Sequence, residues 1–271
     1  MKLLAFDTGT QAMSIAVART VDGQVRVWQH NAAGGAQASI GLIAAMEDLL
    51  AQAGLRLDEL DAICVGAGPG SFTGLRTACS VAQGLAFGAG VPVVAVDSLL
   101  AVAEDARATA LGAQPSGRVT ALLDARMDEM YAATYAFEGR RWTCLQEGVL
   151  VRPEALGTLL ATCAHNAATD VPWALAGNVF DEYGARFGAL PAACASGARI
   201  AALPSAAAML RLAPLLLEDG QAQDAAQALP RYIRDKVAQT TAERMAGKAL
   251  AASAAAGATP ENAPSTLAHT G

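Results

Sequence analysis

The feature that most constrains the fold is a glycine-rich segment at residues 66–76, which reads Gly-Ala-Gly-Pro-Gly-Ser-Phe-Thr-Gly-Leu-Arg. It separates a short apolar run at residues 62–65 from a run of small residues with helical spacing at residues 73–87. This order predicts a strand, a tight turn and the start of a helix. Glycines allow a close approach of the backbone, and helix N-termini attract anions. The segment therefore either contacts phosphate or packs against protein.

The segment lacks both common nucleotide-binding motifs. A Walker loop ends in Gly-Lys-Ser/Thr, and no lysine lies in residues 66–76. The Rossmann pattern requires glycine at a position where Ser71 or Thr73 stands. Ser71 is better suited to cap the helix that follows. A phosphate contact at Gly68 or Gly70 would thus be of a different kind.

Charge and composition exclude several classes of protein. The 271-residue chain carries 19 basic and 25 acidic side chains, a formal net charge of −6, and 53% of its residues are apolar. Nucleic-acid binding depends on neutralising phosphates, so this chain alone is a poor tRNA or DNA binder. Only 16% of the residues are charged, which favours a doubly covered sheet or a surface covered by another protein. The apolar run after Lys2 ends at Asp7, too short for a signal peptide, and we expect a cytoplasmic protein without membrane contact.

The order of apolar runs predicts an α/β fold in the first part of the chain. Hairpins followed by right-handed crossovers give a mixed sheet with helices on its faces. The expected elements are strands at residues 3–6, 14–18, 25–29, 62–65 and 91–96, and helices at residues 42–53, 73–87 and 98–110.

A second unit begins near Arg118 and repeats the opening of the first. A strand ends in Asp124 and is followed at the same spacing by Met130, as Asp7 is followed by Met13. Duplication predicts two lobes, at residues 1–112, which would dock a partner, and 113–236, a reduced C-terminal lobe; residues 237–271 form an Ala-rich low-complexity tail. The expected elements of the second lobe are strands at residues 119–123, 130–137, 173–176 and 230–233, and helices at 153–163 and 206–217.

Asp7-Thr8-Gly9-Thr10, directly after the first strand, resembles the first phosphate motif of the acetate kinase, sugar kinase, heat-shock-70 and actin superfamily. The resemblance implies two RNase-H-like lobes. A hairpin turn stabilised by its own side chains explains the same residues. The second half offers Asp124-Ala125-Arg126 without the glycines of a second phosphate loop. The candidate nucleotide or phosphate contacts are Asp7, Thr8, Gly9, Thr10, Gly68 and Gly70.

The sequence provides no metal or nucleophile motif. His30, His165 and His269 are far apart in the chain and form no His-x-x-x-His pair, so we expect no metal site. Metal-dependent hydrolysis is not expected for the same reason. Ser71 does not lie in a Gly-x-Ser-x-Gly motif, and we expect no catalytic residue.

The helices at residues 42–53 and 73–87 carry apolar and small residues at three- and four-residue spacing. This pattern serves packing within one lobe or docking of a second subunit. On the docking interpretation, Ala82→Arg would abolish complex formation and leave the fold intact. The candidate interface residues are Leu42, Met46, Leu49, Ser71, Phe72, Leu75, Ala78, Ala82 and Leu85.

Several groups of residues resemble the TsaB family, also called YeaZ. They are the N-terminal sequence through Val17, Gly-Pro-Gly-Ser-Phe-Thr-Gly-Leu-Arg at residues 68–76, Asp124-Ala125-Arg126-Met127 with Tyr131, and Pro-Arg-Tyr-Ile-Arg at residues 230–234. The resemblance implies a non-catalytic scaffold or dimerisation subunit of the complex that forms threonylcarbamoyladenosine next to the anticodon of tRNA.

The same resemblance implies the partners. They are a TsaD-like catalytic paralogue, which the chain activates, and a TsaE-like ATPase, with tRNA contacted only through the complex. No cofactor is expected on this chain alone, since ATP and a metal ion belong to the partner subunits. A homodimer in the absence of the partner stays open. The alternative hypothesis is an independent small-molecule phosphotransferase that uses Asp7 and Thr10.

Overall fold

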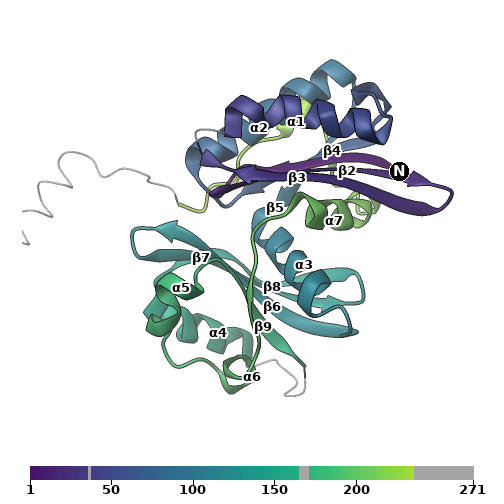
Figure 1. Ribbon diagram of the computed structural model, residues 1–271. Helices are drawn as coiled ribbons and strands as arrows, with labels where there is room; N and C mark the ends of the chain where they lie inside the picture. The colour runs from purple at the N-terminus through teal and green to yellow at the C-terminus, as the bar shows by residue number, and fades with distance from the viewer. Residues whose placement is uncertain (36–37, 165–170, 235–271) are drawn as a thin grey trace, which may run out of the picture. The chain divides into compact units, whose positions relative to one another are not determined.

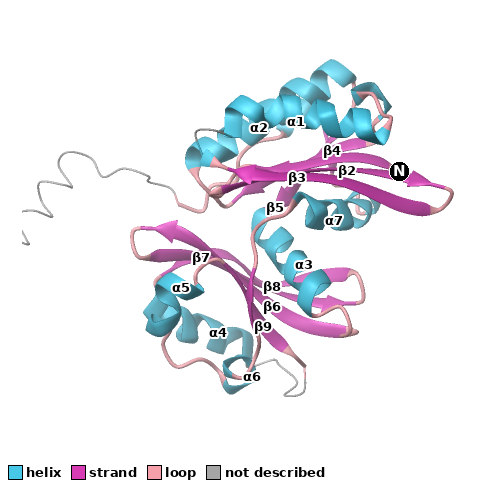
Figure 2. Cartoon of the chain, in the orientation of Figure 1, coloured by secondary structure: helices cyan, strands magenta, loops and turns pink. Residues whose placement is uncertain are grey.

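A computed structural model describes residues 1–35, 38–164 and 171–234 (Figure 1). In these residues the first lobe is built on a six-stranded sheet with the order β11-β5-β4-β1-β2-β3. Figure 2 draws its strands in magenta and the helices that pack on them in cyan. Its strands are β1 (Lys2–Asp7), β2 (Ala12–Val21), β3 (Gln24–Ala33), β4 (Ala62–Gly68), β5 (Val93–Asp97) and β11 (Ala222–Gln223). β4 pairs parallel with both β1 and β5, whereas β2 pairs antiparallel with both β1 and β3. The sheet is therefore mixed, as predicted.

Helices cover both faces of this sheet (Figure 1). α1 (Ala38–Ala53) and α2 (Phe72–Ala89) pack on the face to which Leu4 and Phe6 point. α3 (Ser98–Ala110) and α7 (Ala206–Glu218) pack on the opposite face, against Leu3 and Ala5. Successive residues of a strand point to opposite faces, so β1 is buried on both sides. This double burial explains why its sequence is a continuous apolar run.

The second lobe repeats the strand order of the first. In the described residues it contains a five-stranded sheet with the order β10-β9-β6-β7-β8. The strands are β6 (Ser116–Arg126), β7 (Glu129–Glu138), β8 (Arg141–Val151), β9 (Trp173–Gly177) and β10 (Arg199–Ala201). β6 pairs antiparallel with β7 and parallel with β9, as β1 does with β2 and β4. The predicted duplication and the two RNase-H-like lobes are thus confirmed.

Helix α3 packs against both sheets. Ala101 of α3 belongs to the core of the first sheet, while Leu99 and Val102 pack in the core of the second. Within the described residues, no helix combines the length and hydropathy needed to cross a membrane. The remaining elements are α4 (Leu156–Ala164), α5 (Phe180–Tyr183), α6 (Ala192–Ala195) and the 3-10 helices η2 (Leu57–Glu59), η3 (Pro153–Ala155), η4 (Gly184–Arg186) and η5 (Ala225–Gln227).

After residue 205 the chain returns to the first lobe. The predicted boundaries assign these residues to the second lobe. α7 buries Met209 and Leu212 against the first sheet, and β11 pairs with β5. A single lobe over residues 113–236 is therefore wrong for this last part. The expected strand at residues 230–233 is also wrong, because these residues form no ladder and Arg231 N–H instead donates to the carbonyl oxygen of Ala67 at 2.7 Å. The tail predicted at residues 237–271 lies outside the described residues.

Candidate functional site

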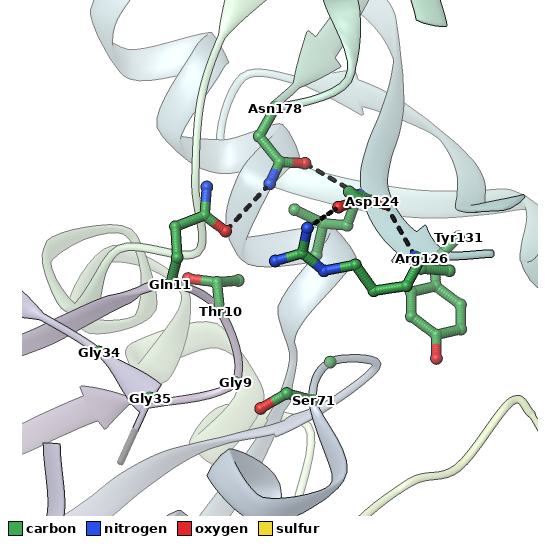
Figure 3. Close-up of a pocket in the computed structure, with 13 residues that line it drawn as sticks. Gly9, Thr10, Gln11, Gly34, Gly35, Ser71, Asp124, Arg126, Tyr131 and Asn178 are labelled. Carbon is green, nitrogen blue, oxygen red and sulfur yellow. Dashed lines mark hydrogen bonds and ion pairs between the residues drawn. The ribbon is translucent and has the colours of Figure 1, made fainter. Parts of the chain in front are cut away.

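A cavity of about 290 Å³ lies where the turns after β1 and β6 face each other (Figure 3). Both lobes line it, and most of its polar groups are backbone amides, hydroxyls and side-chain amides. The first lobe contributes Gly9, Thr10, Gln11, Gly34, Gly35, Gly70 and Ser71, and the second contributes Leu123, Asp124, Ala125, Arg126, Tyr131 and Asn178.

The Asp124 carboxylate stabilises the turn between β6 and β7. Its Oδ1 accepts hydrogen bonds from the Arg126 N–H at 2.8 Å and from the Tyr183 hydroxyl at 3.1 Å. Its Oδ2 pairs with the Arg126 guanidinium at 3.1 Å. The turn needs this support because Arg126, Met127 and Asp128 all have positive φ, a conformation that is uncommon outside glycine.

Asn178 connects the two walls of the cavity (Figure 3). Its Oδ1 accepts a hydrogen bond from the Asp124 N–H at 2.9 Å, and its Nδ2 donates to Gln11 Oε1 at 3.5 Å. The sequence interpretation missed both amides. The available signal was position: Asn178 directly follows β9, and polar residues at the carboxyl ends of parallel strands gather at one edge of a sheet.

Asp7 does not line the cavity. Its side chain is 1% exposed; Oδ1 accepts a hydrogen bond from the Gly9 N–H at 2.7 Å, and Oδ2 accepts one from the Ser98 hydroxyl at 2.9 Å. A Cβ at Gly66 would collide with the same carboxylate. Burial raises the pKa of Asp7 to about 6, and the two hydrogen bonds oppose this rise. Asp7 thus ties the β1–β2 turn to the start of α3.

The glycine-rich segment packs against the β1–β2 turn. Ser71 N–H donates to the carbonyl oxygen of Gly9 at 2.7 Å, and a Cβ on Gly70 would lie 2.6 Å from that oxygen. The Thr8 hydroxyl donates to the carbonyl oxygen of Gly74 at 2.8 Å. Ser71 Oγ accepts the Gly74 N–H at 3.2 Å, which confirms the predicted cap of α2. Close backbone packing therefore accounts for these glycines.

The predicted phosphate contacts divide into two groups. Gly9, Thr10 and Gly70 line the cavity, while Asp7, Thr8 and Gly68 do not. The hydroxyls of Thr10 and Ser71 can donate hydrogen bonds to an anion. The carboxylates of Asp7 and Asp124 accept hydrogen bonds from the backbone of their own turns. In the part of the chain that the structure describes, no three His, Cys, Asp or Glu side chains are grouped as metal ligands would be.

The predicted interface residues are mostly buried within the first lobe. Their periodicity marks the side of each helix that faces its own sheet, because a surface helix buries its apolar stripe. Docking through these side chains is therefore wrong for most of the set, and only Ser71, Phe72 and Leu85 reach the surface. The buried members are Leu42, Met46, Leu49, Leu75, Ala78 and Ala82, none more than 4% exposed.

The exposed sides of α1 and α2 carry other apolar side chains. We call these sides, together with residues 228–232 beside α2, the α1–α2 face. Ile43 is 48% exposed and Phe87 is 85% exposed, and a groove of about 270 Å³ runs past Ile43 and Leu85. The exposed or half-buried apolar side chains of the face are Ile43, Phe72, Leu85, Phe87, Leu229 and Tyr232.

Comparison with known proteins assigns the family. The family model described as TsaD, tRNA N6-adenosine threonylcarbamoyltransferase, matches residues 35–263. The tRNA threonylcarbamoyladenosine biosynthesis protein TsaB of Escherichia coli is 30% identical over 240 residues, which cover 88% of this chain and 96% of that protein. The chain belongs to this family as a TsaB (YeaZ) member. TsaB of Haemophilus influenzae is 36% identical over 135 residues, about half of each chain. The solved structure of YeaZ from Pseudomonas aeruginosa matches with a TM-score of 0.69 at 34% identity, over 85% of this chain and 99% of that one.

The structure explains two of the motifs by which the chain resembles TsaB. The glycine-rich segment provides the close contact between α2 and the β1–β2 turn, and Asp124-Ala125-Arg126-Met127 forms the left-handed turn held by Asp124. Both motifs border the cavity. In this TsaB-family chain they maintain the arrangement of backbone around it.

Proposed function

We propose that this chain is a non-catalytic scaffold subunit of the complex that forms threonylcarbamoyladenosine in tRNA, and that it activates a TsaD-like transferase by docking to it. The observation that carries the proposal is the α1–α2 face, with Phe87 85% and Leu229 64% exposed. Large exposed apolar side chains gathered on one face are typical of protein–protein interfaces. The names of the E. coli and H. influenzae relatives, as tRNA threonylcarbamoyladenosine biosynthesis proteins, support the same pathway.

A non-catalytic role is consistent with how the carboxylates near the cavity are used. Asp7 is buried behind the β1–β2 turn, and Asp124 holds the β6–β7 turn. The metal ion and ATP of the reaction would then belong to the partner subunits, which include a TsaE-like ATPase. The net charge of −6 supports tRNA contact through the complex and not by this chain alone. Homodimerisation through the same face, when the transferase is absent, is part of the proposal.

No observation favours the alternative, an independent phosphotransferase. That activity needs an aspartate beside the transferred phosphate. Asp7 is 1% exposed and does not line the cavity.

Reconstitution tests the proposed function. Threonylcarbamoylated tRNA is measured with a TsaD-like transferase, a TsaE-like ATPase and an enzyme that supplies threonylcarbamoyl-adenylate as the donor, with and without this chain. We expect product only when the chain is present, and undiminished product with Thr10→Ala, which removes a hydroxyl from the cavity. Product formed without the chain would contradict the scaffold role. Loss of activity in Thr10→Ala with the complex still assembled would mean that the cavity takes part in chemistry.

A further inference from the structure

Phe72 and Arg76, at the start of α2, form a cluster with Tyr232 on the α1–α2 face. The rings of Phe72 and Tyr232 stack with centroids 5.3 Å apart. The Arg76 guanidinium lies 3.7 Å from the centroid of Phe72, and its Nε donates to the Tyr232 hydroxyl at 3.1 Å. Phe72 is 38% and Tyr232 is 42% exposed, so the cluster is ordered and still open to solvent.

The backbone on both sides of Tyr232 is anchored, which fixes the ring in place. Arg231 N–H donates to the carbonyl oxygen of Ala67 at 2.7 Å, and the carbonyl oxygen of Ala228 accepts a hydrogen bond from Gln83 Nε2 at 3.2 Å. On the other side, Ile233 reaches the backbone of β8 at Gly148, where an added Cβ would lie 2.7 Å from Ile233 Cδ1. The loss of side-chain freedom that usually opposes binding has therefore largely occurred before a partner arrives.

The terminal nitrogens of Arg76 point to its use. Among the described residues, they have no hydrogen-bond or ion-pair partner, since only Nε is engaged. By contrast, neighbouring Arg231 is paired with Asp97 at 3.3 Å and Glu147 at 3.8 Å. The guanidinium is planar, and the fork of its nitrogens matches the geometry of a carboxylate, which it binds through two parallel hydrogen bonds.

The charges of the two helices give the site a direction. The sequences of α1 and α2 contain one basic residue, Arg76, whereas α1 also presents Glu47 and Asp48 as exposed residues. Glu47 lines the groove with Leu85, near the C-terminal end of α2, whereas Arg76 lies near its start, so an acidic group on a partner is repelled at the groove and attracted at Arg76. Rigid aromatic and arginine side chains at such positions are common among the residues that dominate binding energy.

We propose that Arg76 binds a carboxylate side chain of the docking partner, with Phe72 and Tyr232 as the apolar flank of that contact. This inference rests on the proposed docking of a TsaD-like transferase and specifies its chemistry. The occupant is a protein carboxylate and not an RNA phosphate, because the acidic chain disfavours approach of a polyanion.

The test is the dissociation constant for the purified TsaD-like partner, measured calorimetrically without tRNA at low and high salt. Arg76→Glu should weaken binding at least about tenfold at low salt, and high salt should then strengthen its binding, whereas it weakens that of the wild type, because salt screens repulsion as well as attraction. Arg76→Lys, which keeps the charge and loses the fork, should give a smaller loss. Tyr232→Phe, which keeps the stack and frees Nε, should weaken binding by about threefold.

Arg26→Glu is the matched control, because it makes the same charge change at an exposed arginine on the first lobe. In the strand register Arg26 lies opposite Arg19, and Arg19 lies opposite Lys2 at the start of β1. Arg26 is therefore at the opposite end of the sheet from the glycine-rich segment. Wild-type affinity in Arg76→Glu, with normal docking of the unmodified chain, overturns the inference and leaves the proposed function intact. An effect of Arg76→Glu that appears only after tRNA is added also overturns it. Failure of the unmodified chain to bind removes the proposed docking itself.

Discussion

The Ser98 hydroxyl donates a hydrogen bond to Asp7 Oδ2 at 2.9 Å, and its oxygen accepts one from the Gly68 N–H at 3.3 Å. Ser98 begins α3, Asp7 ends β1 and Gly68 ends β4, so one hydroxyl connects three elements of the first lobe. The carboxylate has only neutral donors in these contacts. Because burial disfavours its charged form, the pKa of Asp7 rises from its ordinary value of 3.8 to about 6.

This raised pKa predicts a pH dependence of stability. The folded chain binds the Asp7 proton more tightly than the unfolded chain does. Protonated Asp7 therefore adds to the free energy of unfolding below its ordinary pKa, and this contribution is lost as the pH rises through about 6. The loss amounts to about 3 kcal/mol for a shift of this size. Asp7→Asn should remove this pH dependence, because an amide does not titrate. The turn should be kept, since the amide oxygen still accepts the Gly9 N–H. The measurement is the urea-unfolding free energy between about pH 4 and about pH 7.

Asp22→Asn, in the exposed β2–β3 turn, is the control and should keep the wild-type slope. The prediction fails if Asp7→Asn and the wild type lose stability in parallel as the pH rises.

The sequence predicted the order of elements because the first lobe has strong local signals. The doubly buried β1 is continuously apolar, and Gly54 and Gly90 end α1 and α2 with positive φ. The duplicated opening at Asp7 and Asp124 correctly predicted the two sheets. The edge strand β8 was missed, because half-exposed residues such as Gln146 and Gly148 interrupt its alternation.

Partner sheets and exposed faces were harder to predict from local patterns. α7 has the periodicity of any amphipathic helix, and nothing in that periodicity says which of two sheets it covers. For the same reason the predicted interface included the buried side of each helix. Leu42 and Ala82 lie at helical spacing because they face the core, and no local pattern distinguishes the exposed Phe87 from a buried residue. The cavity depends on Gln11 and Asn178, which are far apart in sequence and meet only through the lobe arrangement.

Glu104 should be a main determinant of the stability of the α3–α7 contact. It is 2% exposed and accepts hydrogen bonds from Arg107 at 2.7 and 2.8 Å, from Arg211 at 2.8 Å and from Trp142 Nε1 at 3.1 Å. Glu104→Gln removes the charge that both arginines need, and should cost about 2–4 kcal/mol in urea unfolding. Glu218→Gln, at the exposed end of α7, should change little. A loss below about 0.5 kcal/mol for Glu104→Gln would contradict this role.

Two glycines of α2 should respond oppositely to alanine. A Cβ at Gly74 would overlap the carbonyl oxygen of Thr8, whereas a Cβ at Gly84 meets nothing within 4 Å. Gly74→Ala should therefore force α2 away from the β1–β2 turn and destabilise the chain by about 2 kcal/mol or more. Gly84→Ala should stabilise it by about 0.5–1 kcal/mol through helix propensity. Thermal unfolding of both variants measures the contrast, and equal shifts would refute the close contact at Gly74.

Docking and folding should be separable at Phe87 and inseparable at Ala82. Ala82 is fully buried in the core between α2 and the first sheet, so Ala82→Arg places an unpaired charge there and should unfold the lobe. The expectation that this variant keeps its fold is therefore wrong. Phe87→Asp, at an 85% exposed position, should change the unfolding free energy by less than about 1 kcal/mol and weaken binding of the TsaD-like partner at least about tenfold.

Val25→Asp makes the same polarity change at a 65% exposed position on β3, outside the α1–α2 face, and should bind as the wild type does. Calorimetric titration of the partner with each folded variant decides the question. If Phe87→Asp binds normally while Val25→Asp does not, the docking surface lies along the exposed edge strand β3 and not on the α1–α2 face. Loss in both variants would point to a general effect of added negative charge, which high salt would relieve because it screens exposed charges.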